Sequence, residues 1–481
     1  MSFVSIAFFL FLPIVFSVYW LLQRQLQWQN LFLLLASYVF YGWWDWRFLI
    51  LIMVTSASSY VSGLLLSEGF HCLSLSDKAF RRIVVSANII LNIGILGFFK
   101  YYGFFAENLR MAFSQLGYEL DVPTLSIILP VGISFYTFQS LSYTIDVYRE
   151  KLTPTRDIIS FFTFIAFFPQ LVAGPIERAT NLLPQMQQRR LFHYADAVDG
   201  LKRMLWGFFK KMVVADNCAI AVNIIWDDYS NAGAITLIAG MILFTFQIYC
   251  DFSGYSDIAI GTAKLFGIHL MENFRLPYFS RSIGEFWRRW HISLMTWLRD
   301  YVYIPLGGSR AGQWRTFSNT VIVFFISGLW HGANWTFVIW GLYNALLIII
   351  GRSFTSNSKE QSDIASLRNI PSIIFTFVLA ALGWVIFRSS SIAEAYGYLS
   401  CMFTSLLHLQ LGTLLVGKSA ILFCLLLVVV EWLQRRELCP LHLNRCFLGK
   451  NVLLRWAVYY LIFFLTFFFR GEEQTFIYFQ F

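Results

Sequence analysis

The feature that most constrains the fold is an apolar segment of 34 residues, 318–351, with a histidine near its middle. As one helix this segment would be about 50 Å long, but the hydrocarbon core of a bilayer is only about 30 Å thick. Two complete spans and a turn would need more residues than the segment has. The segment therefore predicts a hairpin of two short or tilted helices, with GLWHGANW (328–335) at the turn.

The rest of the chain has the composition of an integral membrane protein. Of its 481 residues, 58% are hydrophobic and 13% are charged, whereas about a quarter of the residues in soluble domains are charged. The apolar stretches are long and continuous, so they predict helices rather than alternating strands. We predict an all-α, polytopic membrane protein. Its net charge of +9 resides in short loops, where basic residues set topology, so we expect no nucleic-acid partner.

Runs close to the roughly 20 apolar residues of a spanning helix mark the candidate spans. The first has no basic region before it and no small-residue cleavage site, so we expect a retained helix and not a signal peptide. The candidates are 3–22, 30–45, 48–66, 84–105, 125–145, 234–260, 371–388, 419–434 and 453–469, with 159–175 and 204–226 as weaker ones. We expect one membrane domain over residues 1–481.

Lysines and arginines in the short loops predict the orientation of the chain. By this rule 67–83, 146–158 and 176–203 are cytoplasmic. Segments 352–370 and 435–451 are also cytoplasmic if 318–351 returns as a hairpin, which we prefer, and lie outside if it crosses once. Segment 159–175 must then enter and leave on one face. Its Pro169 and Gly174 suit a re-entrant segment surrounded by protein. If 318–351 is a hairpin, both chain termini are extracytoplasmic.

Segment 275–315 is the most basic part of the chain and is expected in the cytoplasm. Within it, 286–303 has helical periodicity. Its apolar stripe contains Trp287, Trp290, His291, Leu294, Trp297, Leu298 and Tyr301. These residues predict an amphipathic helix in the cytoplasmic interface, ended by Pro305 and the Gly307–Gly308 pair.

His331 is the first candidate for chemistry, because the hairpin places it deep in the membrane. About 13 residues of helix, or about 20 Å, separate it from the cytoplasmic end. An ionisable group is costly at that depth, and histidine can act as a general base toward a hydroxyl. Gly328 and Gly332 leave room for backbone or substrate, and Asn334 could orient the ring or a substrate carbonyl. Alternatively, His331 is a buried histidine that a helix carbonyl satisfies.

His291 is the second candidate, with a structural alternative of equal weight. It lies on the apolar stripe beside Trp290, so it could simply pack among aromatic anchors at the interface. Arg288 and Arg289 have a similar duality. They either enforce topology or hold phosphates at a cytoplasmic opening.

Two carboxylates, Asp251 and Asp257, lie in the otherwise apolar stretch FQIYCDFSGYSDIAIG (246–261), with Ser253 beside them. They could take part in a site, but we favour a structural role in which they link helices or bind loop backbone.

Cys439, His442 and Cys446 lie close together in the sequence, but no fourth ligand accompanies them. Since a structural zinc site usually has four ligands, we expect an ordinary loop and no metal.

Several stretches together resemble the membrane-bound O-acyltransferase family, and within it the alginate O-acetyltransferase branch. The stretches are FWRRWHISLMTWLRDYVYIPLGGSR, GLWHGANWTFVIWG, YCDFSGYSDIAIG, FFPQLVAGPIER, GISFYTFQSLSYTIDVYR, WGFFKKMVVAD and FIYFQF. The resemblance implies about 10–12 tilted or re-entrant helices around a central tunnel. It also implies that His331 and His291 are the two functional histidines of the family.

The resemblance further implies transfer of an acetyl group within the bacterial inner membrane. Acetyl-CoA would be the cytoplasmic donor, and an extracytoplasmic polysaccharide such as alginate would receive the group through an acetyltransferase or esterase-like partner protein. No resident cofactor is expected. The candidate substrate- and donor-binding residues are Arg288, Arg289, Trp290, Trp330, Asn334, Asp251 and Ser253. The alternatives are a carrier-protein-dependent D-alanyl-type transferase and a non-catalytic transporter or conduit.

Overall fold

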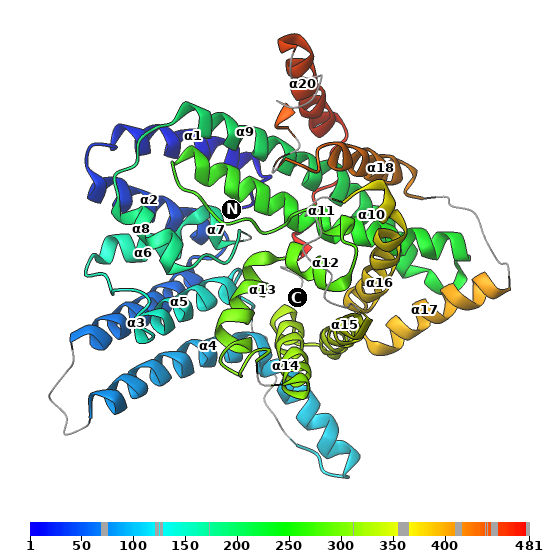
Figure 1. The fold of residues 1–481 in the computed structure, drawn as a ribbon, viewed down its shortest axis with the longest axis horizontal. Coiled ribbons are helices and arrows are strands. Elements are labelled where there is room, and N and C mark those ends of the chain that lie inside the picture. The colour runs from blue at the N-terminus through cyan, green and yellow to red at the C-terminus, as the bar shows by residue number, and fades with distance from the viewer. Residues whose placement is uncertain are drawn as a thin grey trace. The chain divides into compact units, whose positions relative to one another are not determined.

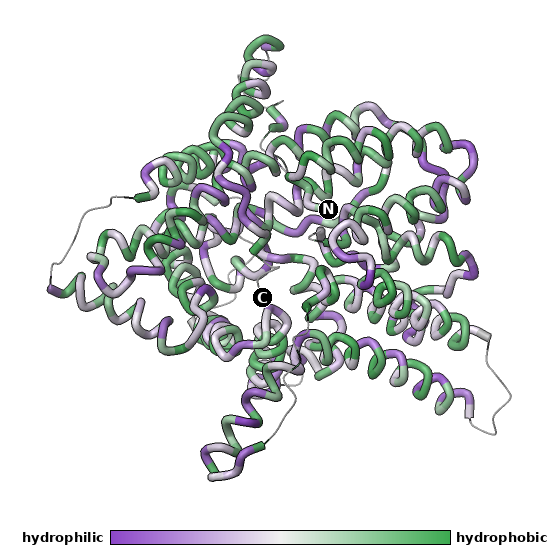
Figure 2. The backbone as a smooth tube through the Cα atoms, turned by 180° about the vertical axis from the view of Figure 1, so that it is seen from behind, coloured by the Kyte–Doolittle hydropathy of each residue, from purple (hydrophilic) through white to green (hydrophobic). Residues whose placement is uncertain are grey.

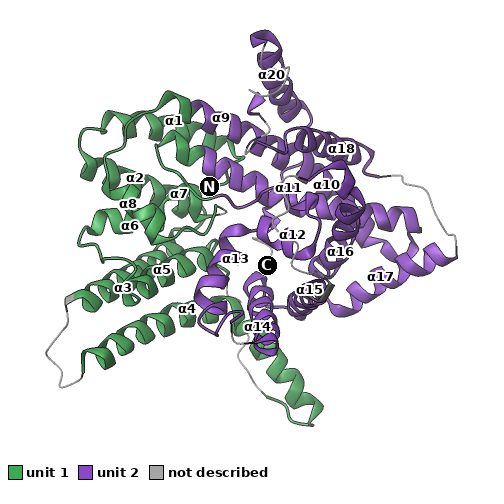
Figure 3. Ribbon diagram, in the orientation of Figure 1, with its two compact units in different colours: residues 1–197, 262–271 green, residues 198–261, 272–481 purple. Residues whose placement is uncertain are grey.

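The structure of the chain is a computed structural model (Figure 1). The structure describes residues 1–68, 76–120, 125, 128–172, 174–310, 312–354, 365–408, 416–437, 439, 441–443 and 451–477. All regular elements among these residues are helices. The chain forms two compact units, one of residues 1–197 and 262–271, the other of residues 198–261 and 272–481 (Figure 3). A single membrane domain over 1–481 stays a prediction.

Unit 1 contains most of the helices of the first 197 residues. They are α1 (Ile6–Leu21), α2 (Leu26–Gly42), η1 (Trp46–Phe48), α3 (Leu49–Glu68), α4 (Asp77–Gln115), α5 (Ile133–Tyr148), α6 (Ile158–Ala166), α7 (Phe168–Leu171) and α8 (Ala179–Gln187). The candidate spans at 3–22, 30–45, 48–66 and 84–105 all correspond to helices here. The last of them lies within α4, which has 39 residues.

The weak candidate 159–175 is an interrupted helix, as its proline and glycine predicted. α6 ends at Ala166, and α7 begins at Phe168 with Pro169 in its first turn. The carbonyl of Phe164 near the break accepts hydrogen bonds from the side chains of Gln139 (3.0 Å) and Gln170 (2.7 Å). Buried amides therefore satisfy backbone that the broken helix leaves open, as apolar surroundings require.

Unit 2 contains the segments singled out for chemistry. Its elements are α9 (Tyr194–Phe208), η2 (Phe209–Ala215), α10 (Asp216–Asp227), η3 (Tyr229–Asn231), α11 (Ala234–Leu265), η4 (Pro277–Phe279), α12 (Ile283–Arg289), α13 (Ile292–Leu298), η5 (Arg299–Tyr303), α14 (Gln313–His331), α15 (Trp335–Phe354), η6 (Leu367–Asn369), α16 (Ile370–Arg388), α17 (Ile392–Leu407), α18 (Lys418–Leu433) and α20 (Val452–Phe468); α9 and α11 each extend into unit 1. α17 was not predicted, although Ser391 and Glu394 carry the pattern of a helix start.

The described helices include five that are long and apolar enough to cross a membrane: Trp46–Ser67, Asp77–Gln115, Ala234–Leu265, Trp335–Arg352 and Leu367–Arg388. Large apolar side chains are exposed on many helices, among them Ile90 (71%), Phe375 (66%) and Phe468 (68%). The apolar residues along these helices are visible in Figure 2. Such surfaces are stable against lipid and not against water. The chain is a multi-pass, all-α membrane protein.

The hairpin predicted at 318–351 is confirmed. α14 ends at His331, residues 332–334 form the turn, and α15 begins at Trp335. Two glycines set the close crossing of its arms. A β-carbon on Gly328 would lie 2.3 Å from the carbonyl oxygen of Phe337, and one on Gly341 would lie 2.3 Å from that of Phe324. Gly328 was expected to leave room for either backbone or substrate, and the structure shows that backbone approaches it closely.

The continuous helix predicted over 286–303 is wrong. α12 ends at Arg289 and α13 begins at Ile292, with His291 in the left-handed region at φ 44°. The break is held by a neighbouring strand-like segment. The amide of Arg275 donates to the carbonyl of Arg289 (3.0 Å), and the amide of Ile292 donates to the carbonyl of Asn273 (2.9 Å). Tertiary hydrogen bonds thus replace helical ones, although the apolar residues still recur at a helical spacing.

The glycine contact yields a prediction for the hairpin. Gly328→Ala forces the arms apart or strains the backbone, so we expect it to destabilise the protein by about 1–3 kcal/mol, a typical cost of overpacking. Thermal unfolding in detergent, followed by circular dichroism, measures the loss. Gly94→Ala on α4 is the control, since a β-carbon there meets nothing within 4 Å. Equal stability of the two variants would show that the close crossing is not required.

Candidate active site

His331 is buried at the end of α14 within an aromatic enclosure. The residue is only 2% exposed to solvent. The ring meets the rings of Trp330, Trp340 and Phe387 at centroid distances of 4.9, 5.0 and 5.2 Å, all nearly edge to face. Aromatic walls exclude water and lower the local dielectric, which strengthens any polar contact made at the ring.

The two candidate histidines both contact one indole ring. The ring centroids of His291 and Trp330 are 5.4 Å apart, and Trp330 also contacts His331. The histidines are 40 residues apart in the sequence, on α14 and on the break between α12 and α13. The structure therefore brings together His331, His291 and Trp330 in one region of unit 2.

His291 is 1% exposed and lies among aromatic rings, with Phe252 of α11 at a centroid distance of 4.7 Å. Its Nδ1 is 3.0 Å from Oδ1 of Asn273. Burial lowers the pKa of His291 to about 3, so its ring is neutral across the physiological range. A neutral imidazole keeps a basic nitrogen available.

Trp290, next to His291 in the break, is connected to the surroundings of His331 through a series of ring contacts. It is fully buried, stacked on Phe286 at 5.5 Å and tilted against Trp384 at 4.8 Å. Trp384 in turn stacks on Trp340, which contacts His331. Trp340, Trp384 and Phe387 were not predicted as site residues. Their sequence neighbourhoods read as ordinary apolar helix, so only the fold reveals them.

Arg288 and Arg289 point to different surroundings. Arg288 lines a cavity of about 1110 Å³. Arg289 is paired with Glu285 at 2.7 Å instead. Arginines and apolar side chains dominate the lining of this cavity: Arg281, Arg288, Arg299, Arg352, Trp287, Ile292, Met295, Val323, Phe324, Leu347, Ile350, Phe375 and Leu379.

The two exposed cations of this cavity without a carboxylate partner are Arg288 and Arg352. Arg281 pairs with Glu285 and Arg299 pairs with Asp300. Within the described part of the chain, neither Arg288 nor Arg352 forms an ion pair. The cavity thus offers two unneutralised positive charges beside an apolar wall. A wall residue, Trp287, packs on Trp340 at 5.5 Å, and Trp340 touches His331.

Asp251 and Ser253 belong to a network of buried charges. Oδ1 of Asp251 is 2.7 Å from Nζ of Lys211, and its Oδ2 accepts a hydrogen bond from the amide of Ile477 (2.7 Å). Ser253 accepts a hydrogen bond from Lys210 (2.9 Å). These contacts fit the structural role that the sequence favoured, with a carboxylate linking α11 to η2 and to backbone near the C-terminal end.

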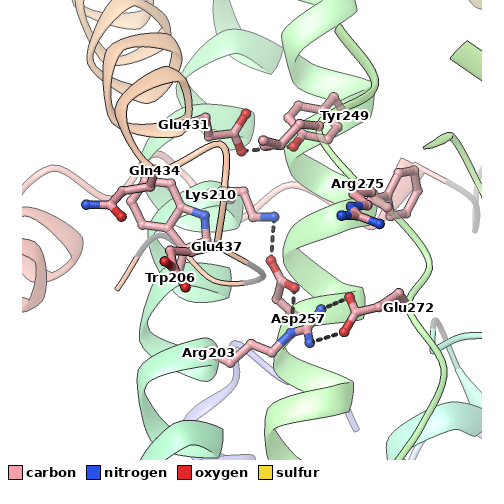
Figure 4. Close-up of a pocket in the computed structure, with 12 residues that line it drawn as sticks. Arg203, Trp206, Lys210, Tyr249, Asp257, Glu272, Arg275, Glu431, Gln434 and Glu437 are labelled. Carbon is pink, nitrogen blue, oxygen red and sulfur yellow. Dashed lines mark hydrogen bonds and ion pairs between the residues drawn. The ribbon is translucent and has the colours of Figure 1, made fainter. Parts of the chain in front are cut away.

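The network continues to Asp257, which lies beside a small polar cavity (Figure 4). Asp257 is 2.5 Å from Lys210 and 2.9 Å from Arg203, and Arg203 also pairs with Glu272. These contacts were not predicted from the sequence. The available signal was the occurrence of Lys210 and Lys211 in an apolar helix together with two carboxylates in another, since such charges require partners.

Asn334 has a structural task in the turn. Its amide donates to the carbonyl of Ser390 (2.8 Å), and its Oδ1 accepts from the amide of Thr336 (3.1 Å) in the first turn of α15. His442 hydrogen-bonds to Asp199, while Cys446 lies outside the described residues. Among the residues that the structure describes, no group of three His, Cys, Asp or Glu side chains could hold a metal ion.

Comparison with known proteins identifies the family to which the chain belongs. The model of the membrane-bound O-acyltransferase family matches residues 150–393, which include both histidines and the hairpin. The chain belongs to the membrane-bound O-acyltransferase family. It is 40% identical over 432 residues to the probable alginate O-acetylase of Pseudomonas syringae, covering 87% of this chain and 80% of the relative. This acyltransferase is also 32% identical over 472 residues to the peptidoglycan O-acetyltransferase of Helicobacter pylori, covering 88% and 87%.

A more distant relative is the teichoic acid D-alanyltransferase of Bacillus subtilis. It is 30% identical over 287 residues, which cover 55% of this chain and 70% of the relative. The similarity to the O-acetylating relatives therefore extends over much more of this O-acyltransferase.

The buried ion pairs yield a prediction for this acyltransferase. Lys211 neutralises both Asp251 and Asp216, each at 2.7 Å. Lys211→Met leaves the two carboxylates buried without that cation, so we expect a loss of about 3–5 kcal/mol in stability. Thermal unfolding in detergent checks it, with the exposed Lys151→Met as the control. If both variants unfold at one temperature, the pairs do not hold η2 to α11.

Proposed function

We propose that this acyltransferase moves an acetyl group from cytoplasmic acetyl-CoA toward hydroxyls of an extracytoplasmic polysaccharide such as alginate. The observation that carries the proposal is the enclosure of His331 by aromatic rings at the tip of a membrane hairpin, where Trp330 contacts both His331 and His291. The names of the relatives similar over most of the chain, an alginate O-acetylase and a peptidoglycan O-acetyltransferase, support acetyl as the group and a polysaccharide as its destination.

In the proposed mechanism, His331 is the general base. Its ring nitrogen takes the proton from the attacking hydroxyl, and the hydroxyl oxygen bonds to the thioester carbonyl carbon. The carbon–sulfur bond then breaks, and the proton passes from His331 to the departing thiolate of CoA. Water is excluded by Trp330, Trp340 and Phe387, which favours transfer over hydrolysis of the thioester.

The cavity beside Arg288 suits a donor with phosphates and a long flexible arm. Arg288 and Arg352 would meet the phosphates, because guanidinium groups bind phosphate oxygens in pairs. The apolar wall would accommodate the arm and lead it toward Trp287. The ring of Trp287 contacts Trp340, which in turn contacts His331. We further propose an inner-membrane location with both termini outside, and an extracytoplasmic partner protein that carries the acetyl group to the polymer.

The main alternative is a carrier protein as donor, as the likeness to the D-alanyltransferase allows. A carrier protein brings its own negative surface and a single phosphate, whereas CoA carries three phosphate groups. The greater coverage by the O-acetylating relatives favours CoA, as do two arginines of one cavity that form no ion pair with the residues that the structure describes.

The first test is His331→Ala in purified protein reconstituted in nanodiscs. With radiolabelled acetyl-CoA and an oligosaccharide acceptor together with the partner protein, we expect transfer to fall at least 100-fold, since general-base catalysis contributes about 10²–10⁴. The variant should remain folded, as measured by gel filtration and thermal unfolding. His193→Ala, which changes an exposed histidine of unit 1, should transfer at the wild-type rate. Retained transfer by His331→Ala would remove His331 from the chemistry.

The second test separates the two neighbouring arginines. Arg288→Gln should raise the KM for acetyl-CoA about 10-fold with little change in kcat, because a charged hydrogen bond contributes about 1.5–3 kcal/mol. Arg289→Gln should change KM much less, since Arg289 faces Glu285, which keeps Arg281 as a partner.

The same steady-state assay, run with acetylated carrier protein in place of acetyl-CoA, identifies the donor. Efficient transfer from the carrier protein alone would replace acetyl-CoA in the proposal. Equal KM values for the two arginine variants would show that the cavity does not bind the donor phosphates.

A further inference from the structure

Asn273 is fully buried and hydrogen-bonds to His291 in the α12–α13 break and to the first residues of α13. Its backbone carbonyl accepts from the amide of Ile292. Its side-chain Oδ1 is 2.9 Å from Oγ of Ser293, 3.4 Å from the amide nitrogen of Ser293 and 3.0 Å from Nδ1 of His291. Its Nδ2 donates to Oγ of Ser256 on α11 (3.2 Å). Every polar atom of this side chain is therefore in use.

These contacts fix which way the Asn273 amide points. A backbone N–H only donates, so the atom that faces the amide of Ser293 must be the oxygen. An amide oxygen only accepts, so Nδ1 of His291 must carry a proton to bond to it. In a neutral ring the other nitrogen, Nε2, then carries the lone pair. Burial lowers the pKa of His291 to about 3, which keeps the ring in this neutral state.

The lone pair on Nε2 has no assigned use within the described protein. Nε2 is buried and has no hydrogen-bond partner among the described residues. Buried nitrogens of this kind are nearly always paired, so an unpaired one requires an explanation such as a catalytic role or a bound molecule. The aromatic rings in contact with the imidazole are those of Phe252, Phe274 and Trp330.

We propose that Asn273 is a positioning residue that locks His291 as the Nδ1-protonated tautomer, so that Nε2 accepts a hydrogen bond from the hydroxyl that receives the acetyl group. This inference rests on the proposed acetyl transfer. His331 remains the base that takes the proton, and His291 holds the acceptor oxygen in line with the thioester carbon. Asn273 touches no reacting atom and acts only through the imidazole ring.

Kinetics of two Asn273 variants test the lock. Asn273→Leu removes the acceptor for Nδ1–H, and we expect kcat to fall about 10–100-fold, the usual cost of losing a partner that orients a functional histidine. The KM for acetyl-CoA should not change. Asn273→Asp keeps every accepting contact, so it should retain most of the wild-type kcat near neutral pH. Its carboxylate stabilises the imidazolium, so its activity should decline toward acidic pH sooner than that of the wild type.

Asn92→Leu is the control for loss of a buried asparagine, because Asn92 is fully buried in unit 1, where its Nδ2 donates to the carbonyl of Asn88 on α4 and to Oγ of Ser58 on α3. It should leave kcat unchanged. A merely structural role for Asn273 predicts loss of stability in both Asn273 variants without the difference in pH profile. Wild-type kcat in Asn273→Leu, or a pH profile of Asn273→Asp identical to that of the wild type, would overturn the lock.

Solid-state ¹⁵N NMR of histidine-labelled protein reads the tautomer directly and does not depend on activity. Subtracting the spectrum of His291→Asn isolates the His291 signals, and Asn is chosen because it tolerates the left-handed backbone. We expect a protonated Nδ1 and a bare Nε2. A proton on Nε2 would overturn the inference. If wild-type protein transfers no acetyl from acetyl-CoA, the proposed function fails, while this spectrum still decides the tautomer.

Discussion

In an apolar environment every polar group needs a partner within the protein, and much of this structure follows from that requirement. The interrupted helix at Phe167 survives because Gln139 and Gln170 bind the carbonyl that the break exposes. The turn after His331 is stabilised by Asn334, which hydrogen-bonds to backbone in the first turn of α15 and in the loop between α16 and α17. The lysines of η2 survive because Asp251 and Asp257 face them. Each irregular or charged position is thus accompanied by a specific polar side chain from another part of the chain.

The same requirement explains which parts of the fold could be predicted. Length and hydropathy are properties of a single segment, so the hairpin at 318–351 and most of the long helices followed directly from the sequence. The break at His291 did not, because its hydrogen-bond partners at 273–275 lie outside the periodic segment. A helical period indicates only which side chains share a face. It does not indicate whether backbone elsewhere in the chain forms hydrogen bonds that replace those of the helix.

The candidate site shows a similar division. His331 and His291 could be singled out because a titratable group is unusual in such surroundings, and the structure places both in contact with Trp330. The difference between Arg288 and Arg289 could not be read from the sequence, because the two adjacent side chains leave the helix about 100° apart. Only the fold shows that one lines a cavity and the other meets Glu285. Trp340 and Trp384 were hidden for a related reason, since apolar residues in a membrane helix face lipid as readily as a site.

His291 combines two properties that ordinary mutagenesis would confuse. At φ 44° its backbone adopts a conformation that costs most residues with a β-carbon about 1–2 kcal/mol, and that asparagine and glycine tolerate better. In a saturation library at this position, the activity of each variant would therefore depend both on how well the new residue adopts the left-handed backbone conformation and on the chemistry of its side chain. Glycine could rank above glutamine for reasons unrelated to acyl transfer. Substitutions at position 291 therefore test the backbone conformation as well as the imidazole, and their effects should be interpreted with both in mind.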